Sequence, residues 1–164
     1  RLDMYVEATA SFNRSKNSIL ELVREPGNLL KYHPFCKRND AITWPGNNSE
    51  DQLEYLNGLT FNRKLFNWSE NGYDLEIGKN KKMALVNWIV EGNDNHSSLT
   101  IRINPEIRNY VPVKNKYLQY LLWFLYVKPK LQSYINHVIK GFDFYIKNNE
   151  LVKHNQFGKH SWFS

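Results

Sequence analysis

Cysteine is nearly absent from this chain, since Cys36 is the only one among its 164 residues. A single cysteine excludes a disulfide bond within the chain. No apolar run near the start has the length or the flanks of a signal peptide or a membrane anchor. We therefore expect a cytoplasmic protein in a reducing compartment.

The sequence motifs of several common chemistries are also missing. The sequence has no Gly-x-Ser-x-Gly nucleophile turn, no P-loop and no dinucleotide-binding glycine pattern. His33 and Cys36 have a spacing found in metal sites, but zinc needs two further ligands and the other histidines form no matching pair. We expect neither a metal nor a cofactor, and no residue can be named as catalytic.

The formal charge of +6 raises the question of a nucleic acid or an anionic membrane as a partner. The basic residues are scattered, however, and the densest run, at residues 79–82, coincides with a predicted hairpin turn. Solvated turn charge explains that run. We expect no nucleic-acid partner and no stable membrane insertion.

The first fifth of the chain alternates between strand and helix patterns. Apolar and polar residues take turns over residues 4–13, which predicts a strand with one buried face. Ser15 can then cap a helix that runs through Arg24. A second short helix is predicted over residues 28–32.

Six further strand patterns fill the middle of the chain, each bounded by turn residues. They cover residues 37–44, 51–56, 59–68, 73–77, 82–91 and 97–105. Asn-Gly pairs at 57–58 and 71–72 supply the positive φ angles that tight turns need. The sequence therefore predicts an antiparallel meander after the first strand.

One long helix is predicted near the end of the chain. Apolar residues recur every three or four positions over residues 129–148, which gives the helix a buried stripe. Gly141 lies within the stripe, where glycine lowers helix stability, so it predicts a close approach to the sheet. No repeat or low-complexity linker divides the chain, and we expect a single domain over residues 1–164.

The order of these elements resembles that of the START/Bet v 1-like superfamily, also called SRPBCC or polyketide cyclase/lipid-transport proteins. Residues 15–32 look like its paired helices, and His33-Pro34-Phe35 looks like its junction into the second strand. Asn87-Trp88 looks like a position in its penultimate strand. The tail at residues 155–164 is similar to that of an uncharacterised bacterial branch.

This resemblance implies an α+β helix-grip fold, in which a seven-stranded curved antiparallel sheet wraps around a long C-terminal helix, with two short helices after the first strand. It also implies a cavity between the concave face of the sheet and that helix. In the superfamily such cavities hold lipids, sterols, hormones or polyketides.

An aromatic content of 15% suits such a cavity, because aromatic side chains make bulky apolar walls with occasional polar tips. We expect binding or transport of a hydrophobic or amphipathic small molecule, lipid-like or polyketide-like. One alternative is an enzyme resembling polyketide cyclases and aromatases, and another is an interaction protein with a collapsed cavity. The expected ligand-binding residues are His33, Tyr55, Phe61, Arg63, Tyr73, Trp88 and Trp123.

Arg63 shares the apolar phase of its strand with Phe61 and Leu65, so strict alternation points it inward. It can bind a ligand carboxylate or phosphate there. It can instead pair with Asp74 or Glu76 on the next strand, or a bulge can turn it outward.

Two further features leave alternatives open. In the strand at residues 82–91 only one of Asn87 and Trp88 can face the core, and the pattern does not decide which. Residues 117–127 are strongly apolar but too few to span a bilayer. A lid over the cavity, a homodimer interface, shallow membrane contact or burial in the core can cover them.

Overall fold

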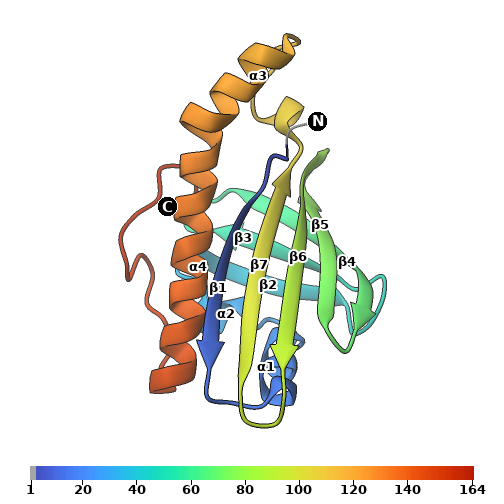
Figure 1. Cartoon of the computed structure of the whole chain (residues 1–164), viewed down its shortest axis with the longest axis vertical. Helices are drawn as coiled ribbons and strands as arrows, with labels where there is room; N and C mark the ends of the chain where they lie inside the picture. Colours follow the sequence, from blue (N-terminus) through green and yellow to red (C-terminus); the bar gives the residue numbers. More distant parts are fainter. Residues whose placement is uncertain (1–2) are drawn as a thin grey trace.

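The computed structural model describes residues 3–164, and its centre is one curved antiparallel sheet (Figure 1). The strand order is β1-β7-β6-β5-β4-β3-β2. The strands are β1 (Val6–Phe12), β2 (Cys36–Thr43), β3 (Glu50–Tyr55), β4 (Thr60–Ser69), β5 (Gly72–Gly78), β6 (Lys82–Gly92) and β7 (Ser97–Pro105). This confirms the predicted seven-stranded meander, with β1 added beside β7.

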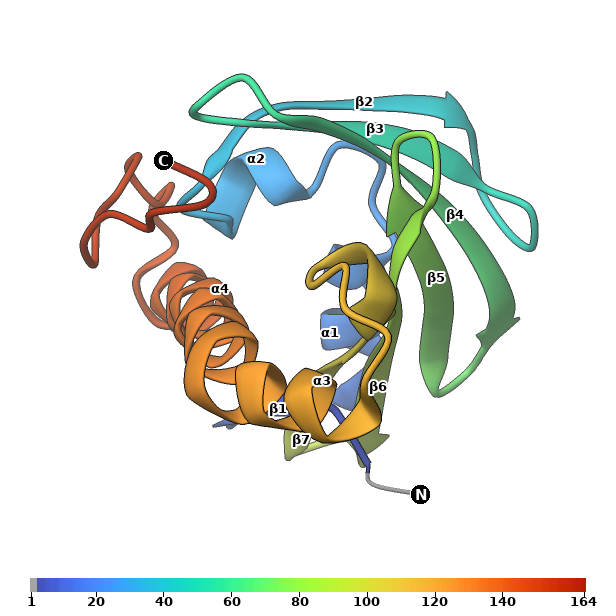
Figure 2. The ribbon, with the colours of Figure 1, turned by 90° about the horizontal axis from the view of Figure 1, so that it is seen from above.

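The sheet curls around the long helix, as Figure 2 shows from above. β1 is joined to the last strand by a register that pairs Val6 with Ile103 and Phe12 with Ser97. The other strands each pair with the next one in sequence. The strand alternation of residues 4–13 is confirmed, because Val6 and Phe12 are buried while Thr9 and Ser11 are exposed.

Two short helices close one end of the sheet. α1 (Lys16–Val23) begins as predicted, since the Ser15 side chain accepts a hydrogen bond from the Ser18 N–H. α2 (Leu29–Tyr32) follows it and leads into β2. Figure 1 places α1 at the end of the sheet opposite to α3.

The long helix begins well before Pro129, and the prediction was wrong in this respect. After the short 3-10 turn η1 (Ile107–Asn109), α3 (Lys116–Leu122), the π-helical turn η2 (Trp123–Val127) and α4 (Lys128–Asn148) follow without a break. The Lys128 N–H donates to the carbonyl of Trp123, five residues back. This wider turn carries the helix into Pro129, whose ring and missing N–H disturb a regular α-helix.

Gly141 allows a close approach, but not to the sheet as predicted. A Cβ atom at this position would overlap the carbonyl oxygen of Tyr32 and come within 3.3 Å of Pro34 Cδ. The neighbour is therefore the end of α2, which would have to move if residue 141 had a side chain.

The inward face of β6 is settled by burial. Ala84, Val86, Trp88 and Val90 are buried, whereas Asn87 is part-buried on the outer face. There its amide donates to Asp74 (2.8 Å). Trp88 is thus the member of the Asn87-Trp88 pair that faces the core.

The tail after α4 returns along the outside of the helix (Figure 1). The Val152 N–H donates to the Lys31 carbonyl and the Asn155 N–H to the Pro34 carbonyl. Phe163 is buried at the end of this path. Among residues 3–164, every helix is too short or too polar to cross a bilayer.

Candidate ligand-binding cavity

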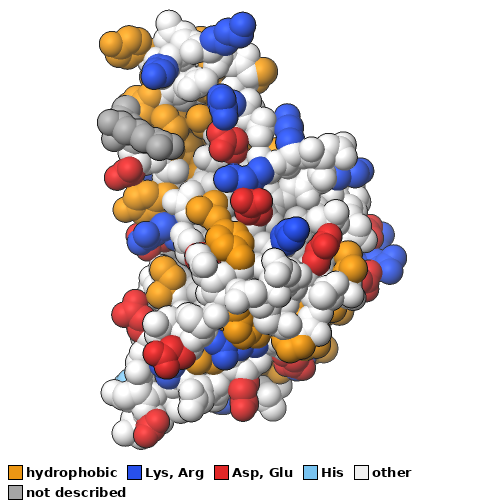
Figure 3. All heavy atoms as spheres, turned by 90° about the vertical axis from the view of Figure 1, so that its right-hand side faces the viewer, with side chains coloured by type: hydrophobic (Ala, Val, Ile, Leu, Met, Phe, Trp, Pro, Cys, Tyr) orange, Lys and Arg blue, Asp and Glu red, His pale blue; other side chains and the backbone are white. Residues whose placement is uncertain are grey.

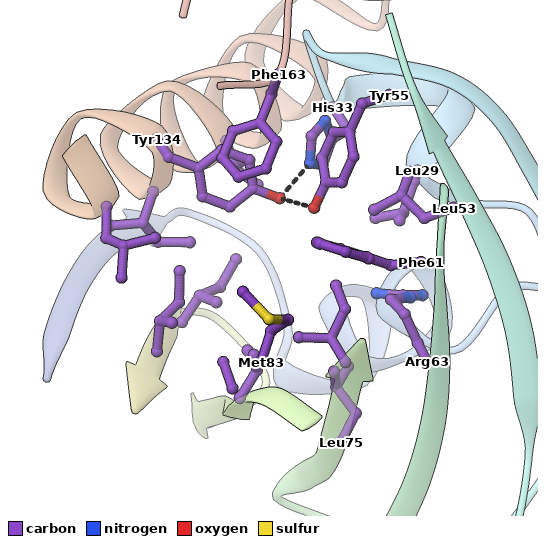
Figure 4. A pocket seen from close by; sticks show the side chains of 18 of the residues that line it. Leu29, His33, Leu53, Tyr55, Phe61, Arg63, Leu75, Met83, Tyr134 and Phe163 are labelled. Atoms are coloured by element: carbon purple, nitrogen blue, oxygen red, sulfur yellow. Dashed lines mark hydrogen bonds between the residues drawn. The ribbon is translucent and has the colours of Figure 1, made fainter. Parts of the chain in front are cut away.

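A small, partly open cavity lies between the sheet and α4, and Figure 4 shows it from close by. Its volume is about 60 Å³, and most of its wall is apolar. Pockets that bind drug-sized molecules usually measure about 300–1,000 Å³. Side chains therefore fill most of the space between the sheet and the helix, and what remains admits a group of only a few non-hydrogen atoms.

Five of the seven residues expected to contact a ligand line this cavity: His33, Tyr55, Phe61, Arg63 and Trp88. Contact with a ligand stays a prediction for each of them. Tyr73 and Trp123 do not line it. Tyr73 donates its hydroxyl to the Val23 carbonyl (2.7 Å) and stacks between Trp68 and Trp88, and Trp123 is buried within η2.

Sequence reasoning missed most of the other residues that line the cavity, among them Tyr134, Phe163 and Met83. Tyr134 lies on α4 three residues after Leu131, so the apolar stripe could have revealed it. Phe163 belongs to the C-terminal tail, and no local sequence pattern predicts that the tail folds back to the cavity. Met83 is part-buried and lies at the start of β6, just after the turn that connects β5 to β6.

A cluster of three polar side chains occupies one wall (Figure 4). The Phe35 N–H donates to His33 Nδ1 (3.1 Å), so the ring proton is on Nε2, which donates to Tyr134 Oη (2.8 Å). Tyr134 and Tyr55 share a hydrogen bond of 3.1 Å between their hydroxyls. Residues from the α2–β2 junction, β3 and α4 thus meet at one point.

Burial keeps all three members of this cluster neutral. Loss of hydration, with the nearby Arg63 charge, lowers the pKa of His33 to about 3. Burial, followed by the influence of Tyr134, raises the pKa of Tyr55 well above its ordinary value. Burial likewise raises the pKa of Tyr134. At neutral pH the cluster is an uncharged imidazole with two protonated phenols.

Counting protons shows that this cluster has one donor to spare. His33 Nε2–H and the two tyrosine hydroxyls supply three hydrogens, and the two hydrogen bonds within the cluster use two. Whichever tyrosine donates to the other, the remaining hydroxyl hydrogen has no acceptor among residues 3–164. The cavity wall therefore presents one neutral hydrogen-bond donor.

Arg63 points inward as predicted, but its partner is a residue that the sequence did not indicate. Its Nε and Nη2 donate to the two carboxylate oxygens of Asp51 at 2.8 and 2.6 Å. Asp74 and Glu76 were the wrong candidates, and the suggested outward turn of Arg63 is also wrong. Burial lowers the pKa of Arg63, but the charge and hydrogen bonds of Asp51 raise it more, so the net shift is upward.

The Arg63–Asp51 pair is tied into the helices. Asn39 donates to Asp51 Oδ2 (3.0 Å), and its own carbonyl oxygen accepts from the Leu29 N–H (3.4 Å). The Asp51 carboxylate of β3 thus connects Arg63 of β4 to Asn39 of β2 and, through Asn39, to the start of α2. This pairing neutralises the charge that Arg63 would otherwise offer to an anionic ligand.

Cys36 is not placed for thiolate chemistry. It is buried, and the loss of hydration raises the pKa of its thiol to about 12, so it stays protonated. Within the described part of the chain, no three His, Cys, Asp or Glu side chains gather closely enough to hold a metal ion.

The comparisons with known proteins give similarity of structure without similarity of sequence. No family model and no curated protein matches this chain. DynU16, a protein of the dynemicin biosynthetic locus, matches with a TM-score of 0.65 over 92% of this chain at 12% identity. This chain covers about half, 49%, of DynU16.

Two smaller proteins match over nearly their whole length. A START superfamily protein from Mycobacterium smegmatis has a TM-score of 0.61 and 14% identity, with 88% of this chain and 98% of that chain covered. The protein XoxI from Bacillus cereus has a TM-score of 0.59 and 14% identity, with 88% and 96% covered. The chain has the START/Bet v 1-like fold. At these identities the likeness concerns the fold alone.

The apolar residues 117–127 lie at the start of the long helix. They form most of α3 and η2, and Figure 1 shows α3 projecting beyond the end of the sheet. Burial in the core is wrong for most of them, because only Trp123 and Val127 are buried. None of them lines the cavity, so in this structure they do not form a lid over it.

Proposed function

We propose that this protein binds or transports a small, mostly apolar molecule that carries one hydrogen-bond acceptor. The spare hydroxyl donor of the Tyr55–Tyr134 pair is the observation that supports this most directly. A buried donor without an acceptor is unfavourable by about 1–3 kcal/mol, and a carbonyl, ether or hydroxyl oxygen of a ligand would satisfy it. The remaining wall is apolar and would contact the hydrocarbon part of the ligand.

Binding requires the cavity to widen. Met83 and Phe61 are part-buried in its wall, and methionine adapts easily because its chain is unbranched and has three rotatable bonds. Rotation of these side chains would enlarge the space without moving the sheet.

The runner-up is a polyketide cyclase-like enzyme that uses His33 or Arg63, and the geometry counts against both. His33 is neutral, so it has no extra proton to give, and Nδ1 already accepts from Phe35 while Nε2 already donates to Tyr134. The Asp51 carboxylate engages Arg63 through two hydrogen bonds. Binding or transport of a small molecule therefore remains our proposal, and we propose that it takes place in the cytoplasm.

The test uses two probes of nearly equal shape. Acetophenone has a carbonyl acceptor, whereas isopropylbenzene has none. The protein should bind acetophenone more tightly, and the preference should disappear in the His33→Phe/Tyr55→Phe/Tyr134→Phe triple variant, which removes all three donors of the cluster, including the His33 Nε2–H that loses its acceptor when Tyr134 is replaced. One hydrogen bond corresponds to about a two- to tenfold change in affinity, which titration followed by NMR can resolve.

Tyr73→Phe is the matched control, because it removes a buried hydroxyl that bonds to Val23 and does not line the cavity. It should leave the preference for acetophenone unchanged. Native mass spectrometry of protein from its source should also show a bound compound that is recovered chemically intact. If neither probe binds and only the unliganded mass is found, the proposal is wrong; if the compound is converted and His33→Ala stops the conversion, the enzyme hypothesis replaces it.

A further inference from the structure

The helix formed by α3 and η2 carries a large apolar surface that residues 3–164 leave mostly exposed. Seven large hydrophobic side chains are exposed there, with Tyr117 at 88% and Leu125 at 63%. They are Tyr117, Leu118, Tyr120, Leu121, Phe124, Leu125 and Tyr126. An exposed apolar surface of this kind on one segment indicates an interaction site.

Basic residues lie at both ends of this apolar surface. Lys114 and Lys116 precede it, and Lys128 and Lys130 follow it, with the Lys128 ammonium 5.7 Å from the centre of the Phe124 ring. The sequence contains no Asp or Glu from residue 107 to residue 142. Asp3 and Glu106 line one groove together with Lys116, and Glu106 is paired with Arg108 (3.3 Å).

Figure 3 shows the same combination in space. At the upper end of the molecule, where Figure 1 places α3, hydrophobic and basic side chains are exposed side by side. The acidic side chains visible on this face lie further down. Apolar and aromatic side chains between lysines are what a helix needs to lie in the interface of an anionic bilayer.

We propose that the helix formed by α3 and η2 docks this protein onto an anionic lipid surface. The apolar side chains enter the boundary between headgroups and acyl chains, while the four lysines contact lipid phosphates. This proposal goes beyond ligand carriage and does not depend on the cavity. It concerns contact with one leaflet and involves no spanning of the bilayer.

The positions of the lysines favour an anionic lipid surface over a second copy of the chain as the partner of this helix. If two such helices packed in parallel, Lys116 would lie beside Lys116, and if antiparallel, beside Lys128 or Lys130. Both arrangements bring like charges together across an apolar contact, which is unfavourable. An anionic surface instead complements the lysines at both ends at once.

Co-sedimentation with vesicles tests the proposal. The protein should bind vesicles of phosphatidylcholine with one third phosphatidylglycerol and should bind pure phosphatidylcholine at least about tenfold more weakly. Raising the salt from about 0.05 M to about 0.5 M should weaken the binding. The Leu121→Ser/Phe124→Ser/Leu125→Ser variant and the Lys114→Gln/Lys116→Gln/Lys128→Gln variant should each lose most of it.

Two matched variants control for apolar area and for charge. Ile42→Ser/Leu151→Ser removes exposed apolar side chains elsewhere, and Lys79→Gln/Lys81→Gln removes exposed lysines from the β5–β6 turn. Both should bind vesicles like the unchanged protein, and near-identical circular dichroism would show that every variant is folded. Equal binding to both vesicle types, or undiminished binding by both α3–η2 variants, would overturn the proposal. A stable dimer that the Leu121/Phe124/Leu125 variant abolishes would likewise overturn it in favour of a second copy.

Discussion

Arg63 and Asp51 are a buried ion pair, and removing one partner leaves the other charged in an apolar wall. We expect Arg63→Met to lower the free energy of unfolding by about 3–5 kcal/mol, because the Asp51 carboxylate loses its counter-charge. Urea denaturation measures this directly. The Arg63→Met/Asp51→Leu double variant should recover much of the loss, since no uncompensated charge remains.

Lys64→Met is the control for this substitution, because Lys64 is the exposed neighbour on the same strand and should change stability little. If Arg63→Met leaves stability unchanged but weakens the binding of acidic ligands and not of neutral ones, Arg63 is an anchor for anionic ligands.

His33 makes the stability of the protein depend on pH. Its pKa falls from 6.5 to about 3 on folding, so between these values the unfolded chain binds a proton that the folded protein does not. Stability is therefore lost as the pH falls from 6.5 toward 3. For one group the slope is about 1.4 kcal/mol per pH unit.

Comparison with His33→Asn isolates this effect, since carboxylates and His160 titrate in both proteins. The difference in unfolding free energy between the two proteins should shrink with that slope as the pH is lowered from about 6 to about 4. A difference that stays constant over this range would mean that His33 is charged in the folded protein, and the proposed hydrogen-bond pattern of the cluster would fail with it.

At the scale of elements, Gly141 fixes how α4 packs on α2. Alanine favours a helix over glycine by about 1 kcal/mol. We nevertheless expect Gly141→Ala to destabilise the protein by about 1–3 kcal/mol, because the new methyl group meets the Tyr32 carbonyl. Thermal unfolding measures the change, and Asn136→Ala, at an exposed position of the same helix, should cause no such loss. A gain in stability for Gly141→Ala would show that α2 can move aside.

The elements were predictable to the extent that local residues decide them. Turn residues and period-two alternation located every strand within one or two residues of its observed bounds, since both signals act over a few residues. The start of the long helix at Lys116 was missed because Pro129 is a common first residue of a helix. The π-helical turn η2, which no sequence pattern predicted, allows the helix to continue through Pro129.

At the scale of the whole molecule, the candidate site was only partly predictable. Alternation correctly predicted that Arg63 points inward. Its partner Asp51 lies opposite it because of the register between β3 and β4, which the sequence of one strand does not determine. Phe163 enters the wall because the tail folds back over α4, a long-range event. The volume of the cavity is likewise a property of all the side chains together, and no segment of the sequence predicts it.

The pairing of the first strand with the last also has a consequence for synthesis on the ribosome. The hydroxyls of Thr9 and Thr100, 91 residues apart in the chain, lie 2.8 Å from one another across β1 and β7. At about 5–20 residues per second, β1 therefore emerges several seconds before its only neighbour in the sheet exists. During that interval its apolar face is uncovered and open to chaperones or to nascent copies, so slowing translation before β7 should increase aggregation more than slowing it afterwards.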